Sequence, residues 1–311
     1  METSPSPSVI RPPKLRLGDT IGIIAPAAAV EVEAVQRGRR TLEEMGFRTK
    51  VGEGMFARHR YLAGPDARRA AELHAMFQDP EVQGIICARA GYGSGRLLPL
   101  LDFSALRSVL KVFVGYSDAT LLLNAFVQRG GFVSFHGPVV AGEFANGLSL
   151  GTRDHFLRLV TAGKGREELT FPHVVRQGTG EGLLLGGCLS VLVTTLGTPF
   201  ALDTTDAVLF LEDVDEKPYR IDRMLTHLKQ ADKLTHLQGV VFGEMRGCWG
   251  ESSDPVELLA IIAEIFAEYD YPVAFGLPAG HGSENLILPL GTRVRLDVYR
   301  RCLVFLEPAV E

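Results

Sequence analysis

The chain has 311 residues, 46% of them hydrophobic, and its 32 basic residues against 37 acidic ones give a formal net charge of -5. These values fit a packed globular protein of two domains or one large one, and without a basic block nucleic acid is not an expected partner. The four cysteines are far apart and form no CxxC pair, which excludes zinc-knuckle spacing and favours a reducing compartment.

The N-terminal stretch METSPSPSVIRPP has neither the basic nor the apolar region of a secretory signal, and we expect residues 1–14 to be a disordered lead-in. The longest apolar run, Leu183–Gly197, is too short to span a bilayer and contains three glycines, so we expect a buried core helix there. The sequence therefore predicts a soluble, cytoplasmic protein with no membrane partner.

In the first half, short apolar runs rich in β-prone residues alternate with helical patterns. This alternation predicts a parallel sheet with helices on both faces, the doubly wound arrangement. The expected strands are 21–27, 48–52, 84–88, 111–115 and 132–136, and the expected helices are 30–45, 67–77 with Asp66 as cap, and 118–128.

The second half is more mixed, because its last strands follow one another without helices. We expect an α+β domain with a small barrel-like sheet, and a domain boundary near 161–182, where glycine and charge replace periodicity. The expected domains are therefore 15–165 and 180–311. The expected strands are 207–213, 239–245, 272–278, 293–298 and 302–308, and the expected helices are 218–231 and 255–269, the latter with Pro255 at its first position.

The stretch Gly115-Tyr116-Ser117-Asp118-Ala119 has the form G-x-S-x-A between an expected strand and an expected helix. A nucleophile elbow has this form, because only small residues fit two positions before and after the serine. The amide of Asp118, at the helix N-terminus, is then placed to face an oxyanion. The alternative is that Ser117 or Asp118 simply caps the helix.

A nucleophilic serine needs a base and a group to orient it. Of the eight histidines, His136 and His281 each follow a strand and lie next to glycine, although a structural role is open for both. Glu212 closes the apolar strand AVLFLED, where a carboxylate is either a solvated edge charge or a functional group. The order serine, acid, histidine is one of those that catalytic triads use.

The segment ARAGYGSGR, residues 88–96, follows the third expected strand. Its glycine spacing fails the dinucleotide fingerprint G-x-G-x-x-G, but such a loop at the carboxyl end of a parallel strand can offer an amide to an oxyanion. Arg89 is either a reader of a substrate carboxylate or a salt-bridged structural residue.

Eight blocks in series give the chain a resemblance to the LD-carboxypeptidase family of serine peptidases, which includes the microcin C immunity peptidases. The resemblance runs from about Leu15 to Leu306. The blocks are LRLGDTIGIIAPA, RYLAGPDARRAAEL, ARAGYGSGRLL, VGYSDATLLLNAF, FHGPVV, LLGGCLSVLVTTLGTPF, LFLEDVDEKPYRIDRMLTHL and GLPAGHGSENLILPLG.

The resemblance implies a Ser117, Glu212 and His281 triad, with the amides of Asp118 and of the glycine loop near Gly91 as oxyanion hole. It implies cleavage of the L,D bond before a terminal D-alanine in muropeptides, a homodimer, and no metal or organic cofactor. We expect Arg89, Tyr92 and Tyr116 to contact this substrate. Three positions depart from the family pattern: Pro65, Ala90 in place of a glycine, and Cys188 where asparagine is common.

Two rival functions stay open on the sequence. One is an immunity-type hydrolase of peptidyl- or aminoacyl-nucleotides, in which Trp249 would stack on a base, although a loop tryptophan more often packs. The other is a sensor that binds a muropeptide or nucleotide without chemistry.

Overall fold

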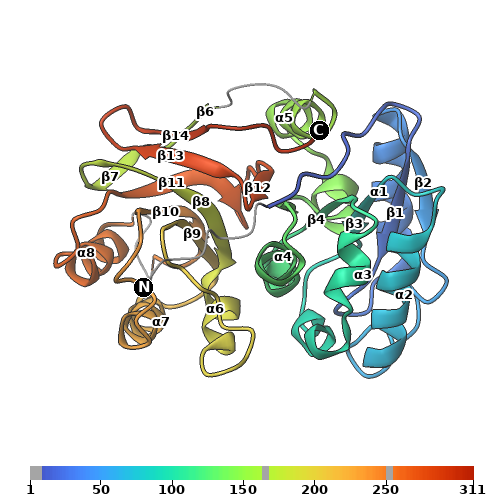
Figure 1. Cartoon of the computed structure of the whole chain (residues 1–311), viewed down its shortest axis with the longest axis horizontal. Coiled ribbons are helices and arrows are strands. Elements are labelled where there is room, and N and C mark those ends of the chain that lie inside the picture. Colours follow the sequence, from blue (N-terminus) through green and yellow to red (C-terminus); the bar gives the residue numbers. More distant parts are fainter. Residues whose placement is uncertain (1–8, 163–167, 250–254) are drawn as a thin grey trace.

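A computed structural model describes residues 9–162, 168–249 and 255–311. Figure 1 shows two lobes, each formed by one β-sheet with helices packed against it. No helix in these three ranges is long and apolar enough to cross a membrane. The architecture is mixed α/β, and the catalytic candidates lie where the two sheets approach each other.

The N-terminal sheet has the order β12-β5-β4-β3-β1-β2, in which β1 to β5 are parallel. The order 2-1-3-4-5 is one of the doubly wound orders, as the alternation in the sequence predicts. The sixth strand comes from the C-terminal half and pairs antiparallel with β5. The strands are β1 Thr20–Ile24, β2 Arg48–Val51, β3 Gly84–Cys87, β4 Val112–Gly115, β5 Ser134–His136 and β12 Leu288–Leu290.

Helices cover both faces of this sheet. Side chains of α1 and α5 share one buried cluster with one sheet face, while α2, α3 and α4 pack on the other face. That second cluster continues without a break into the core of the C-terminal lobe. The helices are α1 Val32–Glu44, α2 Asp66–Gln78, α3 Phe103–Arg107, α4 Thr120–Ala125 and α5 Leu150–Ala162.

The C-terminal sheet has eight strands in the order β6-β14-β13-β8-β9-β10-β11-β7. Its central strands β8, β9, β10 and β11 are parallel, and its outer strands are antiparallel. The strands are β6 Glu168–Thr170, β7 His173–Arg176, β8 Thr179–Cys188, β9 Ala207–Val214, β10 Gly239–Arg246, β11 Val273–Gly280, β13 Arg293–Asp297 and β14 Cys302–Phe305. The helices are α6 Leu189–Leu192, α7 Pro218–Gln230 and α8 Val256–Ile265.

Several expectations for this half need correction. Within the described strands no pairing joins β6 to β7, so the sheet is open and not barrel-like. The run 183–197 is not a core helix: it continues β8 and then forms only the short α6 and a 3-10 turn. This strand lies between β13 and β9 and is buried on both faces toward its end, so it lacks the polar alternation that marks a half-exposed strand.

Other differences concern segment ends. The stretch 161–182 holds β6, β7 and the start of β8. Residues 9–14 are ordered, because Ile10 bridges Phe132 and the Lys14 amide donates to the Glu311 carbonyl; residues 1–8 lie outside the described part. Asp66 is the first residue of α2 and not its cap, since the cap position is Pro65. Pro255 caps α8, and this helix ends before the expected residue 269.

Helix α4 connects the two lobes. The Asn124 side chain exchanges hydrogen bonds of 2.9 and 3.0 Å with the carbonyl and amide of Gly186 in β8. The Thr120 hydroxyl accepts a third bond, 3.1 Å long, from the Cys188 amide. The helix that follows the candidate nucleophile is therefore fixed to the strand beside the one that carries Glu212.

Candidate active site

Ser117 lies at the turn between β4 and the helix that contains α4. Its φ is +57°, a left-handed conformation that a serine adopts only at a cost. A Cβ on Gly115 would come within 2.9 Å of the Ala119 Cβ and of the Cys87 Sγ. The turn is as tight as the G-x-S-x-A pattern predicts, and it holds the serine partly exposed in a strained backbone.

Glu212 and His281 are brought together from β9 and from the loop that follows β11. Their side chains form a 2.6 Å contact between Nδ1 of His281 and Oε2 of Glu212, and the His281 amide donates to the same oxygen at 3.2 Å. Glu212 is fully buried, and the His281 side chain is 14% exposed. Nδ1 therefore donates to the carboxylate, and Nε2 is left to exchange a proton with another group.

The electrostatics of this pair suit a general base. Burial lowers the pKa of His281, but the hydrogen bond and charge of Glu212, with smaller contributions from Asp213 and Glu143, outweigh burial and raise it above 6.5. Burial raises the pKa of Glu212, while the hydrogen bond from His281 opposes that shift. The carboxylate thus stabilises the imidazolium that forms when a proton is taken up.

Tyr116, next to the serine, packs against this base. Its ring centroid lies 4.8 Å from that of His281 and 5.8 Å from that of His136. Its pKa is raised by burial and then by the charge and hydrogen bond of Glu143. Tyr116 is only 8% exposed, so its side chain packs against His281 and offers little surface to a substrate.

His136, the other histidine singled out in the sequence, is fully buried between Tyr116 and Phe210. Burial, followed by the charge of His281, lowers its pKa to about 3. It is therefore neutral at physiological pH, which leaves His281 as the candidate base.

Within the described ranges the Ser117 hydroxyl makes no hydrogen bond to His281. The structure therefore assembles the Glu212–His281 half of the expected triad and places the serine one residue from the tyrosine that covers the base. In unliganded sites such contacts are often long and tighten only around the substrate.

The glycine loop lies next to the nucleophile turn. The Asp118 carboxylate accepts hydrogen bonds from the amides of Gly93 and Ser94, at 3.2 and 2.7 Å. The amides of Gly91 and Asp118 have no acceptor in the described part of the chain, and so both are available to an oxyanion. Gly91 has a φ of +130°, and a Cβ there would lie 2.5 Å from the Ala28 Cβ.

Arg89 and Tyr92 lie on the exposed side of this loop. The Arg89 guanidinium donates to the carbonyls of Ala29 and Ala90, at 3.1 and 3.0 Å, and forms no salt bridge with a described residue. Tyr92 is 58% exposed, and its ring lies 5.9 Å from that of Tyr61. Both side chains are exposed, and among the described residues neither has a hydrogen bond or ring contact with Ser117, Glu212 or His281.

Three further carboxylates near the base escaped the sequence analysis. The negative charge of Glu143 raises the pKa of both Tyr116 and His281. Glu244 packs against Gly282, and burial followed by the charge of Glu284 raises its pKa. The one available signal was Glu244 in GVVFGEM, an acid near the end of a buried strand as Glu212 is. This side of the site is therefore acidic and favours a positively charged group.

The family of the chain follows from both halves of this arrangement. Residues 21–137 match the LD-carboxypeptidase N-terminal domain, and residues 181–296 match the LD-carboxypeptidase C-terminal domain. The chain belongs to the LD-carboxypeptidase family. It is 37% identical over 298 residues to the probable murein peptide carboxypeptidase of Bacillus subtilis, and this match covers 94% of this chain and 93% of the relative.

Two other comparisons bear on the function of this LD-carboxypeptidase family member. The solved muramoyltetrapeptide carboxypeptidase from Oxalobacter formigenes is 31% identical, with a TM-score of 0.82 over 92% of this chain and 97% of that one. The microcin C7 self-immunity protein MccF of Escherichia coli is 27% identical over 91% of this chain and 92% of its own. The family and these names support a hydrolase that acts on peptides.

Cys188, one of the three departures from the family pattern, is the last residue of β8. The Cys188 thiol is buried, 3.4 Å from the Ser190 hydroxyl and 3.8 Å from the Asp213 carboxylate. Trp249 packs against the core of the C-terminal lobe, which is the structural role left open for it in the sequence.

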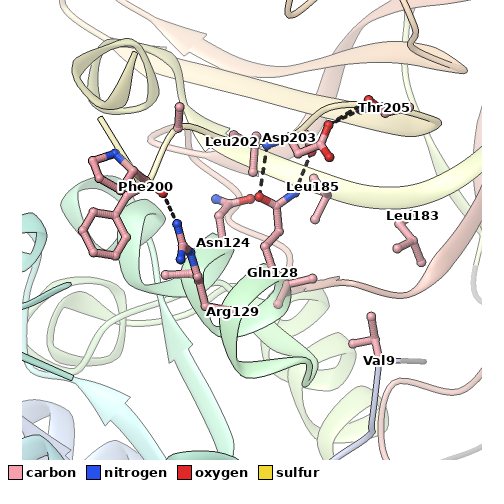
Figure 2. A pocket seen from close by; sticks show the side chains of 14 residues that line it. Val9, Asn124, Gln128, Arg129, Leu183, Leu185, Phe200, Leu202, Asp203 and Thr205 are labelled. Atoms are coloured by element: carbon pink, nitrogen blue, oxygen red, sulfur yellow. Dashed lines mark hydrogen bonds between the residues drawn. The ribbon is translucent and has the colours of Figure 1, made fainter. Parts of the chain in front are cut away.

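A cavity of about 360 Å³ at the seam of the lobes contains none of the triad candidates. Figure 2 shows that its polar side chains bind across the seam: Gln128 contacts the main chain of Asp203 in both directions, at 2.6 and 3.1 Å. Arg129 donates to the Pro199 carbonyl and lies over the Phe200 ring, 5.3 Å from its centroid. The cavity therefore belongs to the lobe contact and not to the chemistry.

Proposed function

We propose that this chain is a serine LD-carboxypeptidase that removes the terminal D-alanine from muropeptide tetrapeptides, as in cell-wall recycling. The observation that carries the proposal is the buried Glu212–His281 pair, 2.6 Å apart, beside a serine held in a left-handed turn. Membership of the LD-carboxypeptidase family supports the same assignment.

In the proposed reaction, His281 Nε2 takes the proton of the Ser117 hydroxyl as its oxygen attacks the carbonyl carbon of the L-residue. The free amides of Asp118 and Gly91 receive the negative oxygen of the tetrahedral intermediate, and loss of one such donor typically costs about 10²–10³ in rate. The intermediate collapses with cleavage of the C–N bond, and His281 protonates the leaving amine of D-alanine. Water, deprotonated by His281, then hydrolyses the acyl-enzyme.

The surroundings of the base support a substrate with a positively charged side chain. Glu244 is half-buried, and burial and the neighbouring Glu284 raise its pKa, which an ammonium group nearby would reverse. A diamino acid before the scissile bond supplies such a group. On the other side, Arg89 in the exposed part of the glycine loop is the proposed reader of the terminal carboxylate, with Tyr92 beside it and Tyr116 acting through His281.

Release of D-alanine from a purified muropeptide tetrapeptide tests the proposal, with the native chain compared to Ser117→Ala. Release by the native chain that vanishes in the variant is the expected result. Persistent release by the variant would show that Ser117 is not the nucleophile. Glu216→Gln is a suitable control, because Glu216 follows β9, which carries Glu212, and forms an ion pair with the exposed Arg220.

The second candidate is an immunity-type hydrolase of peptidyl- or aminoacyl-nucleotides, which the relationship to MccF supports. Trp249 is half-buried and packs against the core of the C-terminal lobe, so it gives this candidate no specific support. Hydrolysis of an aminoacyl-nucleotide analogue without release of D-alanine would favour this candidate, and failure on both substrates would favour a ligand-binding sensor. We further propose that the protein is cytoplasmic and forms a homodimer. The mass of the native protein in solution tests the dimer.

A further inference from the structure

Arg69 is a buried cation that joins three loops at the catalytic edge of the N-terminal sheet. It lies on α2 and is 2% exposed. Its guanidinium donates to the Pro26 carbonyl after β1, to the Gly64 carbonyl before α2 at 3.2 Å, and to the Gly93 carbonyl after β3 at 2.9 Å. A salt bridge to Asp66 completes its contacts.

Asp118 is a buried anion that holds the same loop from the other side. It is 3% exposed, and its carboxylate accepts from the amides of Gly93 and Ser94. The Ser94 hydroxyl in turn donates to the Asp118 carbonyl at 2.6 Å. The peptide group between Gly93 and Ser94 therefore has its carbonyl on Arg69 and its N–H on Asp118. Because each charge faces the opposite end of the peptide dipole, both contacts are charge-assisted.

The glycine loop needs such anchoring because its own backbone does not restrict it. Gly91 and Gly93 have φ values of +130° and +133°, which glycine adopts readily along with many other conformations. The unpartnered Gly91 amide is two residues from the anchored peptide. Oxyanion donors are effective only when they are held in place before the reaction.

We propose that Arg69 is a positioning residue for catalysis, which with Asp118 fixes the Gly93–Ser94 peptide and thereby the oxyanion-hole amide of Gly91. This inference rests on the proposed function. Asp118 supplies one oxyanion donor through its own amide and anchors the loop of the other donor through its side chain. Arg69 fixes the far end of this unit and has no contact with the substrate.

The variants Arg69→Met and Arg69→Lys test the proposal. Methionine retains the volume without donors, and lysine retains the charge but has no planar fork for several carbonyls. The matched control is Arg96→Met, because Arg96 also pairs with Asp66 but is exposed and contacts no loop carbonyl through its side chain. Folding is checked for each variant by thermal unfolding.

Two readouts separate positioning from a purely structural role. In D-alanine release, Arg69→Met should lower kcat by about 30-fold or more while KM changes less than about threefold, and Arg69→Lys should be intermediate. The rate at which a fluorophosphonate modifies Ser117 should fall in parallel, since its phosphoryl oxygen occupies the oxyanion hole. Arg96→Met should match the native chain in both.

Native-like modification rates and kcat in a folded Arg69→Lys or Arg69→Met variant would overturn the inference, as would a rise in KM alone. If Arg69→Met does not fold, Arg69→Lys decides between the outcomes. A native chain that neither reacts with the fluorophosphonate nor releases D-alanine would instead overturn the proposed function, and this inference with it. A chain that reacts at Ser117 but releases no D-alanine would overturn only the substrate, and the modification rates would still test Arg69.

Discussion

Replacing Glu212 by glutamine is expected to move the pH dependence of the enzyme to lower pH while lowering its maximal rate. His281 is active as a base only when it is neutral, so kcat/KM rises with pH through the pKa of His281, which Glu212 holds above 6.5. Glutamine keeps the size of the side chain, and the His281 amide that now donates to Oε2 can hold the glutamine oxygen in the same place. The substitution therefore removes a charge while it keeps the size of the side chain, and it places the glutamine NH2 where the buried Oε1 of Glu212 has no hydrogen-bond partner among the described residues.

The size of the shift follows from the 2.6 Å contact between a fully buried carboxylate and the imidazole. A hydrogen bond to a charged group contributes about 1.5–3 kcal/mol, which at 1.36 kcal/mol per pKa unit is a shift of about one to two units. Burial, which lowers the pKa of His281, is unchanged, so the direction is downward. The rate above this pKa should fall by about 10²–10⁴, because glutamine neither holds His281 in the required tautomer nor stabilises the imidazolium.

The assay is D-alanine release as a function of pH for the native chain, Glu212→Gln and the surface control Glu216→Gln. The control should keep the native profile. An acidic limb that stays in place or moves to higher pH in Glu212→Gln would refute the assignment of that limb to His281.

Three further expectations can be checked by urea unfolding or by rate. Because Ser117 has a φ of +57°, Ser117→Gly should be more stable than Ser117→Ala by about 0.5–1 kcal/mol; equal stabilities would show that the turn is unstrained. Gly115→Ala, whose Cβ would lie 2.9 Å from two neighbours, should cost about 1–3 kcal/mol and most of the activity, whereas Gly151→Ala, with no atom closer than 3.8 Å, should cost neither. His136 has a folded pKa of about 3 against 6.5 for the unfolded chain, so the unfolded state binds more protons between these values and stability should rise with pH there; His136→Phe should lower this slope by up to about 1.4 kcal/mol per pH unit, and an unchanged slope would place the effect elsewhere.

The local features of the site could be predicted from the sequence because they depend on neighbouring residues. The glycine and alanine on either side of Ser117 indicate a tight turn, and the structure shows why a larger residue at Gly115 would clash. The pairing of Glu212 with His281 rested on family resemblance, since the residues are 69 positions apart and lie on β9 and after β11, which are not adjacent strands.

The failures have a common physical cause in tertiary context. A strand buried on both faces loses the alternation that distinguishes it from a buried helix, which explains the error at 183–197. β12 is only three residues long, and although it comes from the C-terminal half it pairs with β5 of the N-terminal sheet. No local sequence pattern therefore predicts this strand. Glu143 lies in a π-helical turn with an irregular Gly142, and no periodicity predicts that its carboxylate reaches Tyr116.

The loop 281–287 begins at the end of β11 in one sheet and ends at β12 in the other. His281, the proposed base, thus lies on a connection whose two ends belong to different sheets. A chimera that joined the first 165 residues of this chain to the second half of a relative would inherit a foreign edge strand in its N-terminal sheet. An exchange of halves between relatives should therefore give a folded protein only where residues 288–290 and their partner strand 134–136 come from the same relative. The two lobes therefore have to be exchanged together.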